Sequence, residues 1–245
     1  MCGRFVQASN IETIAAYYRA SPDPRLKRGE IEPNYNVAPT QIVLQVTESG
    51  SKDPSAGGTR IIEEARWGFV YPWARSLEDK PQPINARIES VLSKAGFKEA
   101  FLHRRSVVPA DGFYEWKRIP GSPKQPWYLH PPEGEMLSMA AIWSVWRPPE
   151  EGRPEAPIVT CALITVPAQG LAAQIHDRMP ALLDRESVDR WLSQGSDDPN
   201  ELIELLLRSS RSFVLEGHPV SRRVNNPAAN DASLVEKIES PTGGI

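Results

Sequence analysis

The chain has 245 residues, with 28 Lys and Arg against 31 Asp and Glu, so its formal net charge is −3. Apolar residues make up 40% and charged residues 24%, values that exclude a wholly disordered chain. No run approaches the roughly 18 apolar residues of a membrane-spanning helix, and the N-terminal MCGRFVQASN lacks the order of a secretory signal. We therefore expect no membrane association and a cytoplasmic location, at the nucleoid in a bacterium or in the nucleus in a eukaryote.

Short strands dominate the predicted elements, as the 24 prolines also favour. The predicted strands are Ile42–Val46, Ile61–Trp67, Ser106–Pro109, Phe113–Arg118, Trp127–His130, Met136–Trp143, Ile158–Val166 and Ser212–Leu215. The predicted helices are Ile11–Arg19 with Ser9 or Asn10 as its cap, Ile88–Leu102 with a break at Gly96, Arg185–Leu192 and Glu201–Arg208. The predicted surface loops are Glu48–Gly58, Arg147–Pro157 and the tail after Ser240.

These elements predict an α+β fold. Strands and helices do not alternate regularly, which disfavours a parallel βαβ sheet. We expect one compact domain over residues 1–240, built around a curved, mostly antiparallel β-sheet with peripheral helices, and a short flexible tail over residues 241–245.

The charge is unevenly distributed along the chain. Residues 65–118 contain ten Lys and Arg against six Asp and Glu, whereas residues 184–240 contain seven against eleven. A phosphate responds to the local field more than to the net charge, so this acidic protein is compatible with a nucleic-acid partner.

Cys2 has an unusual chemical position. Removal of Met1 would leave Cys2 with a free α-amine next to its thiol, and about 10% of such an amine is unprotonated at pH 7. The amine can attack an aldehyde, and the thiol can then close a five-membered thiazolidine on the imine. The alternative is that Cys2 merely follows the start residue. With only one other cysteine, Cys161, we expect neither a disulfide framework nor a metal site, and no cofactor.

Three further polar clusters are candidates for chemistry. Asn85 can cap a helix and leave Arg87 to bind a phosphate, although an ion pair of Arg87 with Glu89 is an alternative. Glu115 lies between large aromatic side chains, where desolvation raises a carboxyl pKa towards the range of acid–base catalysis, or else pairs with a basic neighbour on a solvated face. His176, in IHDRMP, either transfers protons or belongs to a hydrogen-bonded turn.

Aromatic residues offer a possible surface for unpaired bases. Trp67 and Trp73 flank a Gly/Pro-containing turn beside Arg66 and Arg75, an arrangement typical of single-strand binding. Packing in the core is the alternative for either tryptophan.

Taken together, these motifs resemble one known family. The segments are MCGRF (1–5), YNVAPTQ (35–41), RWGFVYPWA (66–74), NARIES (85–90), VVPADGFYEW (107–116), IHDRMP (175–180) and VSRRVNNPAAND (220–231). In this order they resemble the SRAP family, the SOS-response-associated peptidases, which are also described as abasic-site processing proteins.

The resemblance implies a function and a set of site residues. It implies a covalent crosslink between the N-terminal cysteine and abasic sites in single-stranded DNA, formed by a monomer with a positively charged groove. The implied catalytic residues are Cys2, Asn85, Glu115 and His176. The implied DNA-binding residues are Arg4, Asn36, Pro39, Trp67, Arg87 and Arg178. The implied activities also include β-lyase cleavage and removal of the initiator Met by peptidase action.

Two other function classes remain open from the sequence. An N-terminal-cysteine amide hydrolase would use the Cys2 thiol to form a thioester. A noncovalent single-stranded DNA-binding module would use the tryptophans and arginines alone.

Overall fold

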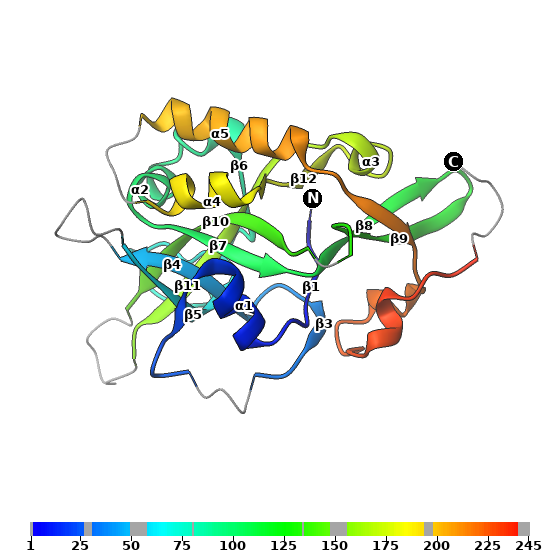
Figure 1. Ribbon diagram of the computed structural model, residues 1–245, viewed down its shortest axis with the longest axis horizontal. Coiled ribbons are helices and arrows are strands. Elements are labelled where there is room, and N and C mark those ends of the chain that lie inside the picture. The colour runs from blue at the N-terminus through cyan, green and yellow to red at the C-terminus, as the bar shows by residue number, and fades with distance from the viewer. Residues whose placement is uncertain are drawn as a thin grey trace.

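The strands of this computed structural model form two sheets (Figure 1). The residues described are 2–26, 31–49, 58–79, 81–133, 135–147, 156–193 and 198–239. The five-stranded sheet has the order β14 (Glu216–Pro219), β9 (Ser122–His130), β8 (Gly112–Ile119), β1 (Phe5–Gln7), β3 (Asn34–Val37). The nine-stranded sheet has the order β12 (Arg178–Pro180), β11 (Ile158–Pro167), β10 (Leu137–Trp146), β7 (Arg105–Ala110), β4 (Ile42–Ser49), β5 (Thr59–Trp67), β2 (Ser21–Pro22), with β13 (Leu182–Leu183) on β10 and β6 (Asn85–Arg87) on β11.

The larger sheet closes on itself. β11 pairs with β10 on one side and with β5 at Thr160–Arg66 and Cys161–Trp67, so β5, β4, β7, β10 and β11 form a continuous ring. Most pairings are antiparallel, and the parallel ones join β11 to β5 and β6 and join β2 to β5. The predicted α+β class with mostly antiparallel pairing is confirmed, but the strands lie in two sheets instead of one.

A single residue, Asp111, connects the nine-stranded sheet, which is closed, to the five-stranded sheet, which is open. β7 ends at Ala110 and β8 begins at Gly112, in different sheets. The carboxylate of Asp111 between them accepts the N–H groups of Ala8 (2.6 Å) and Ser9 (3.0 Å), just after β1. This crossing places β8 directly beside β1.

Helices cover the outside of the closed sheet. They are α1 (Ile11–Tyr18), α2 (Ala95–His103), α3 (Gly170–Ala173), α4 (Arg185–Leu192) and α5 (Pro199–Ser212), with the 3-10 turn η2 (Ile88–Ser90). Two further 3-10 turns, η3 (Arg222–Asn225) and η4 (Ala232–Val235), pack on the five-stranded sheet. In Figure 1, α5 runs along one side of the molecule and α4 lies between α5 and the strands β7 and β10. The predicted cap of the first helix is confirmed, because the Asn10 side chain accepts the N–H of Thr13 at 2.8 Å. No helix in the described ranges has the length and apolarity needed to cross a bilayer.

The predicted strand at Ser212–Leu215 is wrong. α5 continues through Ser212, and the next strand is β14. Two serines of α5 face the core and bind neighbouring backbone: Ser210 Oγ accepts the N–H of Leu182 (3.0 Å), and Ser209 Oγ accepts that of Asp184 (2.9 Å). These tertiary bonds stabilise a helical turn that serine propensity alone does not favour.

Much of the predicted loop sequence, including residues 50–57, 148–155 and 240–245, lies outside the described residues, as does Met1. The domain boundary at residue 240 and the flexible tail therefore stay predictions.

The predicted helix break at Gly96 is also wrong, and the reason is steric. Gly96 lies inside α2, and a Cβ atom there would lie 2.3 Å from Cδ1 of Tyr71. The Tyr71 ring stacks on Phe97 (5.9 Å between centroids) and on Trp73 (5.0 Å). Gly96 is thus required by the close approach of a stacked aromatic ring to the helix.

We predict that Gly96→Ala destabilises the protein. Alanine favours a helix over glycine by about 1 kcal/mol, but displacing the stacked rings costs about 1–3 kcal/mol, so the melting temperature falls. Adding Tyr71→Ala makes room for the new methyl group. In the Tyr71→Ala background, Gly96→Ala should therefore be neutral or stabilising in thermal denaturation, and an equal loss in both backgrounds would contradict the steric explanation.

Candidate active site

The four predicted catalytic residues come from separate elements that meet next to β1. Cys2 precedes β1, Asn85 begins β6, Glu115 lies in β8, and His176 lies between α3 and β12. The N–H of Tyr114 donates to the carbonyl of Arg4 (2.9 Å), which extends the β1–β8 pairing towards Cys2. Asn85 Nδ2 donates to the Cys2 carbonyl at 2.8 Å. The N-terminal segment is thereby held between β8 and β6.

The Cys2 thiol is completely buried. Burial raises the thiol pKa far above its ordinary value, and the negative charge of Glu115 raises it further. The Sγ atom lies 3.8 Å from the carbonyl oxygen of Arg4, the acceptor of its hydrogen bond. The thiol is therefore neutral at physiological pH, and a nearby base must take its proton when sulfur forms a bond.

Glu115 has the environment that the sequence predicted. Its side chain is buried, burial raises its carboxyl pKa, and the neighbouring His176 partly opposes that rise. The side chains of β8 alternate with the period of two of a strand: Phe113 packs in the main core, whereas Tyr114 and Trp116 pack in a second cluster on the other face. Glu115 thus lies close enough to both Cys2 and His176 for their charges to influence one another.

The His176 ring is fixed by its own turn. Its Nδ1 accepts the backbone N–H of Arg178 (3.1 Å), which requires the neutral ring to carry its proton on Nε2. The carboxylate of Asp177 lies 2.8 Å from the same nitrogen, a contact suited to the protonated ring. The turn therefore fixes the orientation of an imidazole, a side chain that is able to transfer protons.

Asn85 does not cap a helix, contrary to prediction. It pairs with Leu163 of β11 as part of β6, and η2 begins after Arg87 with no side-chain cap. The Oδ1 atom of Asn85 is buried and has no hydrogen-bond partner among the described residues. The Asn85 amide thus binds Cys2 through Nδ2, and its Oδ1 atom can accept a hydrogen bond from another group in the site.

Arg178 binds Glu89, and the predicted pairing of Arg87 with Glu89 is not formed. Arg178 makes a bidentate ion pair with Glu89 (2.6 and 3.1 Å) and donates to the Thr165 carbonyl at 2.5 Å. Partial burial raises the Glu89 pKa, but Arg178 and Arg87 outweigh that effect and leave the pKa lowered. Arg87 is exposed and makes no side-chain hydrogen bond to the described residues. Of these two arginines, Arg87 is the one available to a phosphate.

Arg4 and Asn36 fasten the C-terminal segment, which we define as residues 221–235. Arg4 Nη1 donates to Asn36 Oδ1 (2.7 Å) and to the Val224 carbonyl (2.8 Å). Asn36 Nδ2 in turn donates to the carbonyls of Asn226 (2.9 Å) and Ala229 (2.8 Å). Asn36 is only 1% exposed, so its side chain lies beneath the surface that a DNA strand would reach.

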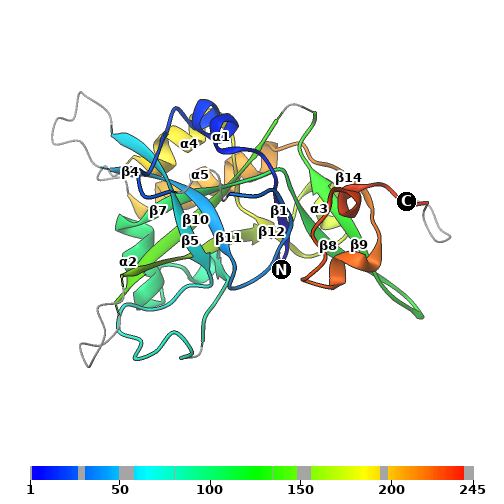
Figure 2. The same ribbon diagram turned by 90° about the horizontal axis from the view of Figure 1, so that it is seen from below.

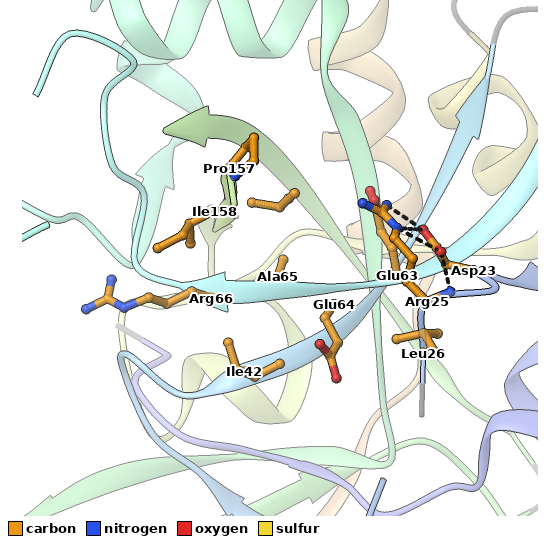
Figure 3. Close-up of a pocket in the computed structure, with 11 residues that line it drawn as sticks. Asp23, Arg25, Leu26, Ile42, Glu63, Glu64, Ala65, Arg66, Pro157 and Ile158 are labelled. Carbon is orange, nitrogen blue, oxygen red and sulfur yellow. Dashed lines mark hydrogen bonds and ion pairs between the residues drawn. The ribbon is translucent and has the colours of Figure 1, made fainter. Parts of the chain in front are cut away.

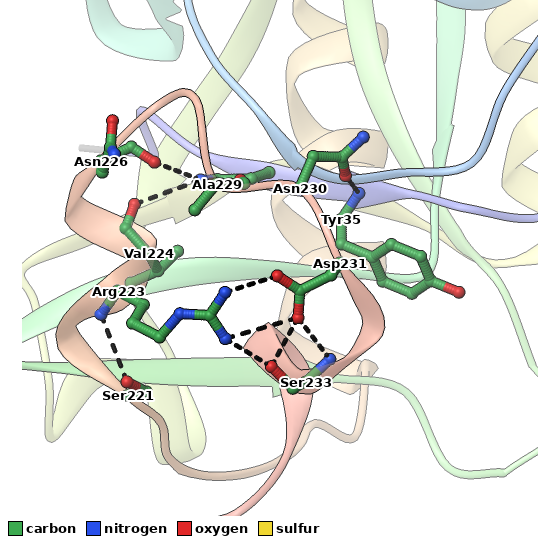
Figure 4. A network of polar contacts seen from close by, with 10 residues as sticks. Tyr35, Ser221, Arg223, Val224, Asn226, Ala229, Asn230, Asp231 and Ser233 are labelled. Carbon is green, nitrogen blue, oxygen red and sulfur yellow. Dashed lines mark hydrogen bonds and ion pairs between the residues drawn. The ribbon is translucent and has the colours of Figure 1, made fainter.

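The C-terminal segment is also bonded internally (Figure 4). Arg223 pairs with Asp231 at 2.6 Å and donates to Ser233, and Asp231 accepts the N–H of Ser233. Asn230 Oδ1 accepts the N–H of Tyr35, next to Asn36. The C-terminal segment is therefore internally ordered and is hydrogen-bonded to residues near the start of the chain.

Trp67 lies in the core, whereas Trp73 lies on the surface. The Trp67 indole is fully buried, packs edge-on against Phe5 (5.0 Å between centroids) and donates to the Ile84 carbonyl. Trp73 is 65% exposed. A base cannot stack on Trp67 in this conformation, so Trp73 replaces it as the accessible aromatic. Pro39, in the turn before Thr40, is partly exposed.

A cavity of about 260 Å³ lies away from these residues (Figure 3). Its lining comes from four separate segments and includes none of the predicted site residues. They contribute Asp23, Arg25 and Leu26; Ile42; Glu63–Arg66; and Pro157–Val159. Nothing in the sequence indicated it, because no single motif contains its walls. Across the described ranges, no three His, Cys, Asp or Glu side chains converge as metal ligands would.

Comparison with known proteins decides the family. The family model described as SOS response associated peptidase (SRAP) matches residues 1–227. The chain belongs to the SRAP family. It is 34% identical to the abasic site processing protein YoqW of Bacillus subtilis over 96% of this chain and 99% of the relative. It is 33% identical to YedK of Escherichia coli (97% and 100% covered) and 33% identical to chicken HMCES (98% and 78% covered), both also named abasic site processing proteins.

The SRAP fold is also found in solved structures. A crystal structure of a Bacteroides thetaiotaomicron protein superposes with a TM-score of 0.79 at 23% identity, covering 97% of this chain and all of that one. The fold prediction made from the motifs is thus confirmed.

We predict that Asn36→Ala lowers the free energy of unfolding by about 1–3 kcal/mol, because it leaves the Arg4 guanidinium and two carbonyls without their buried partner. Asn230→Ala is the matched control, since this exposed side chain makes a bond at the rim of the same segment. The control should lose less than about 1 kcal/mol in urea denaturation. Equal losses would contradict the central role of Asn36.

Proposed function

We propose that this SRAP protein processes abasic sites in single-stranded DNA by forming a covalent crosslink through Cys2. The observation that carries the proposal is that Asn85 binds the Cys2 carbonyl and Glu115 lies near the buried Cys2 thiol, with His176 beside Glu115. The names of the relatives, abasic site processing proteins over nearly the whole chain, support the same substrate.

The chemistry requires both functional groups of Cys2. After removal of Met1, the α-amine attacks the C1′ aldehyde of the ring-opened deoxyribose, and one water leaves as the imine forms. The S–H group then adds across the C=N bond, so sulfur binds carbon and the nitrogen gains a proton. The product is a thiazolidine, and the net loss is one water.

Each neighbour has a distinct proposed part in these steps. Glu115 accepts the thiol proton and moves protons during imine formation, because burial raises its carboxyl pKa and makes it a stronger base than an exposed carboxylate. His176 protonates the sugar ring oxygen as the ring opens. Asn85 orients the amine, since its amide already binds the Cys2 carbonyl.

The DNA strand is bound by its phosphates. Arg87, which is exposed, is the proposed phosphate ligand, and Trp73 the proposed stacking surface. Arg4, Asn36 and Arg178 support the site from beneath through their protein contacts. The protein acts as a monomer in this proposal.

Two further activities follow from the same groups. The imine can eliminate and cleave the strand, which would make the protein a β-lyase, but a thiol on the adjacent carbon traps the imine faster. Peptidase action is proposed only for release of Met1, which lies outside the described residues.

The decisive experiment is a denaturing gel with single-stranded DNA that contains one abasic site. We predict a heat-stable adduct whose intact mass equals the sum of protein without Met1 and DNA, less one water. Cys2→Ala keeps the amine and should give only an imine, which survives denaturation after borohydride reduction and not before.

Three outcomes would overturn this assignment. A heat-stable adduct from protein that retains Met1 would exclude the amine, because an amide nitrogen cannot form an imine. Binding that disappears in SDS would favour a noncovalent module. Release of ammonia from glutamine, with no DNA adduct, would favour an amide hydrolase.

We predict that Glu115→Gln raises the melting temperature at pH 7 and slows both formation and reversal of the crosslink. The folded-state pKa of Glu115 lies above the unfolded value near 4.3. Stability is therefore lost as the pH rises between the two values, and glutamine removes this loss.

The stabilisation by Glu115→Gln should vanish as the pH falls towards 4, which thermal denaturation from pH 4 to 8 can measure. Glu236→Gln, at an exposed position, is the control and should change neither stability nor rate. Wild-type rates for Glu115→Gln at every pH would reduce Glu115 to a structural residue.

A further inference from the structure

Three cations without acidic partners lie at one end of the open sheet. We name Arg118, Lys124 and Arg222 the basic strip. All three are exposed, and none forms an ion pair with a carboxylate in the part of the chain that the structure describes. Residues 116–132 contain no Asp or Glu, so the part of the β8–β9 hairpin beyond Glu115 carries only positive charge on a protein of net charge −3.

The strip lies on the face of the hairpin that carries Trp116. Arg118 follows Trp116 by two residues in β8 and therefore lies on the same face. The register of β8 and β9 shifts between Lys117 and Ile119, and Lys124 lines the same cavity as Arg118. Arg222 Nη2 donates to the Pro123 carbonyl at 3.2 Å, and Trp116 Nε1 donates to Asn225 Oδ1 at 2.8 Å, so η3 lies against that face too. A cavity of about 390 Å³ between Arg118 and Lys124 gives the strip a concave end.

The strand β8 runs directly from the candidate active site to the strip, although Trp116 and Glu115 point to opposite faces of it. The N-terminal segment runs antiparallel to β8, with Arg4 opposite Tyr114, so Cys2 lies beside the Glu115–Trp116 part of the strand. From Trp116 to Ile119 the strand advances by about 10 Å. In Figure 2 the hairpin reaches past the body of the molecule, with the orange segment that contains η3 beside its base.

We propose that the basic strip binds phosphates of the DNA strand that flanks the lesion on one side, beyond the nucleotides at Cys2. This inference rests on the proposed function. Guanidinium and ammonium groups bind phosphate oxygens without reading bases, and three exposed cations without a carboxylate partner among the described residues complement the charge of a polyanion. Continuity with β8 favours DNA over an acidic peptide, because a strand held at Cys2 must leave the site along one of its edges.

The test compares two triple variants with equal net charge. Arg118→Gln, Lys124→Gln and Arg222→Gln together remove the strip. Lys98→Gln, Arg208→Gln and Arg211→Gln together remove three exposed cations on α2 and α5. Binding of a 20-nucleotide single strand with a central, reduced abasic site is measured by fluorescence anisotropy across a salt series. Crosslinking of a trinucleotide with a central abasic site is measured separately on denaturing gels.

For the strip variant, we expect affinity for the 20-nucleotide strand to fall about tenfold or more at 50 mM salt. The slope of log K against log salt should become shallower by about 2, since each single-strand contact contributes about 0.7. The control variant should stay within about twofold of wild type. Both variants should crosslink the trinucleotide at the wild-type rate, because the strip lies outside the reacting site.

Polarity gives an independent measure. With the lesion two nucleotides from the 5′ end or from the 3′ end, only one of the two strands should lose affinity in the strip variant. Equal losses on both strands, equal losses in the control variant, or an unchanged slope would each overturn the proposal. If the wild type crosslinks and the strip variant binds the 20-nucleotide strand as the wild type does, only the proposal for the basic strip is refuted. If the wild type does not crosslink, the proposed function is refuted.

Discussion

The position of the first few residues determines the rest of the site. β1 is an interior strand, paired with β3 on one side and β8 on the other, although it has only three residues. Hydrogen bonds from Tyr114 to the Arg4 carbonyl and from Asn85 to the Cys2 carbonyl continue the fixed position of β1 as far as Cys2. A residue next to a chain end is normally poorly ordered, and here pairing on both sides and burial remove that freedom. The other candidate catalytic residues, Asn85, Glu115 and His176, lie around Cys2, whose position is fixed in this way.

Burial gives the site its chemistry and also destabilises it. The thiol of Cys2 and the carboxyl of Glu115 both have pKa values raised by desolvation, so neither is ionised as readily as in water. A fold selected only for stability would fill this space with apolar side chains. The arrangement is understandable if the two groups exchange a proton during a reaction, since a carboxyl with a raised pKa can take the proton of a neutral thiol. The stability cost of such groups is typical of functional sites.

Arginines in this protein serve two different purposes. Arg4 and Arg178 form directed bonds within the fold, to Asn36 and Val224 in one case and to Glu89 and Thr165 in the other. Arg87 is exposed and carries no such bond among the described residues, and within the exposed basic strip Arg222 has one, to the Pro123 carbonyl. An acidic protein can therefore present positive charge to a phosphate strand locally, because these exposed cations form no ion pair with a carboxylate of the described residues. The net charge of −3 says nothing about this division.

The sequence by itself determined the family, the fold class and most strands and helices. It also determined the alternation in β8 that buries Glu115, because a period of two is a local property of the backbone. It did not show that Trp67 is buried whereas Trp73 is exposed, that Gly96 lies inside a helix, or that Asn36 is buried beneath the C-terminal segment. Those outcomes depend on which distant segment covers each residue: Phe5 and Ile84 cover Trp67, Tyr71 covers Gly96, and the C-terminal segment covers Asn36. Local sequence fixes the direction in which a side chain points, but only the tertiary structure decides whether it meets solvent or another part of the chain.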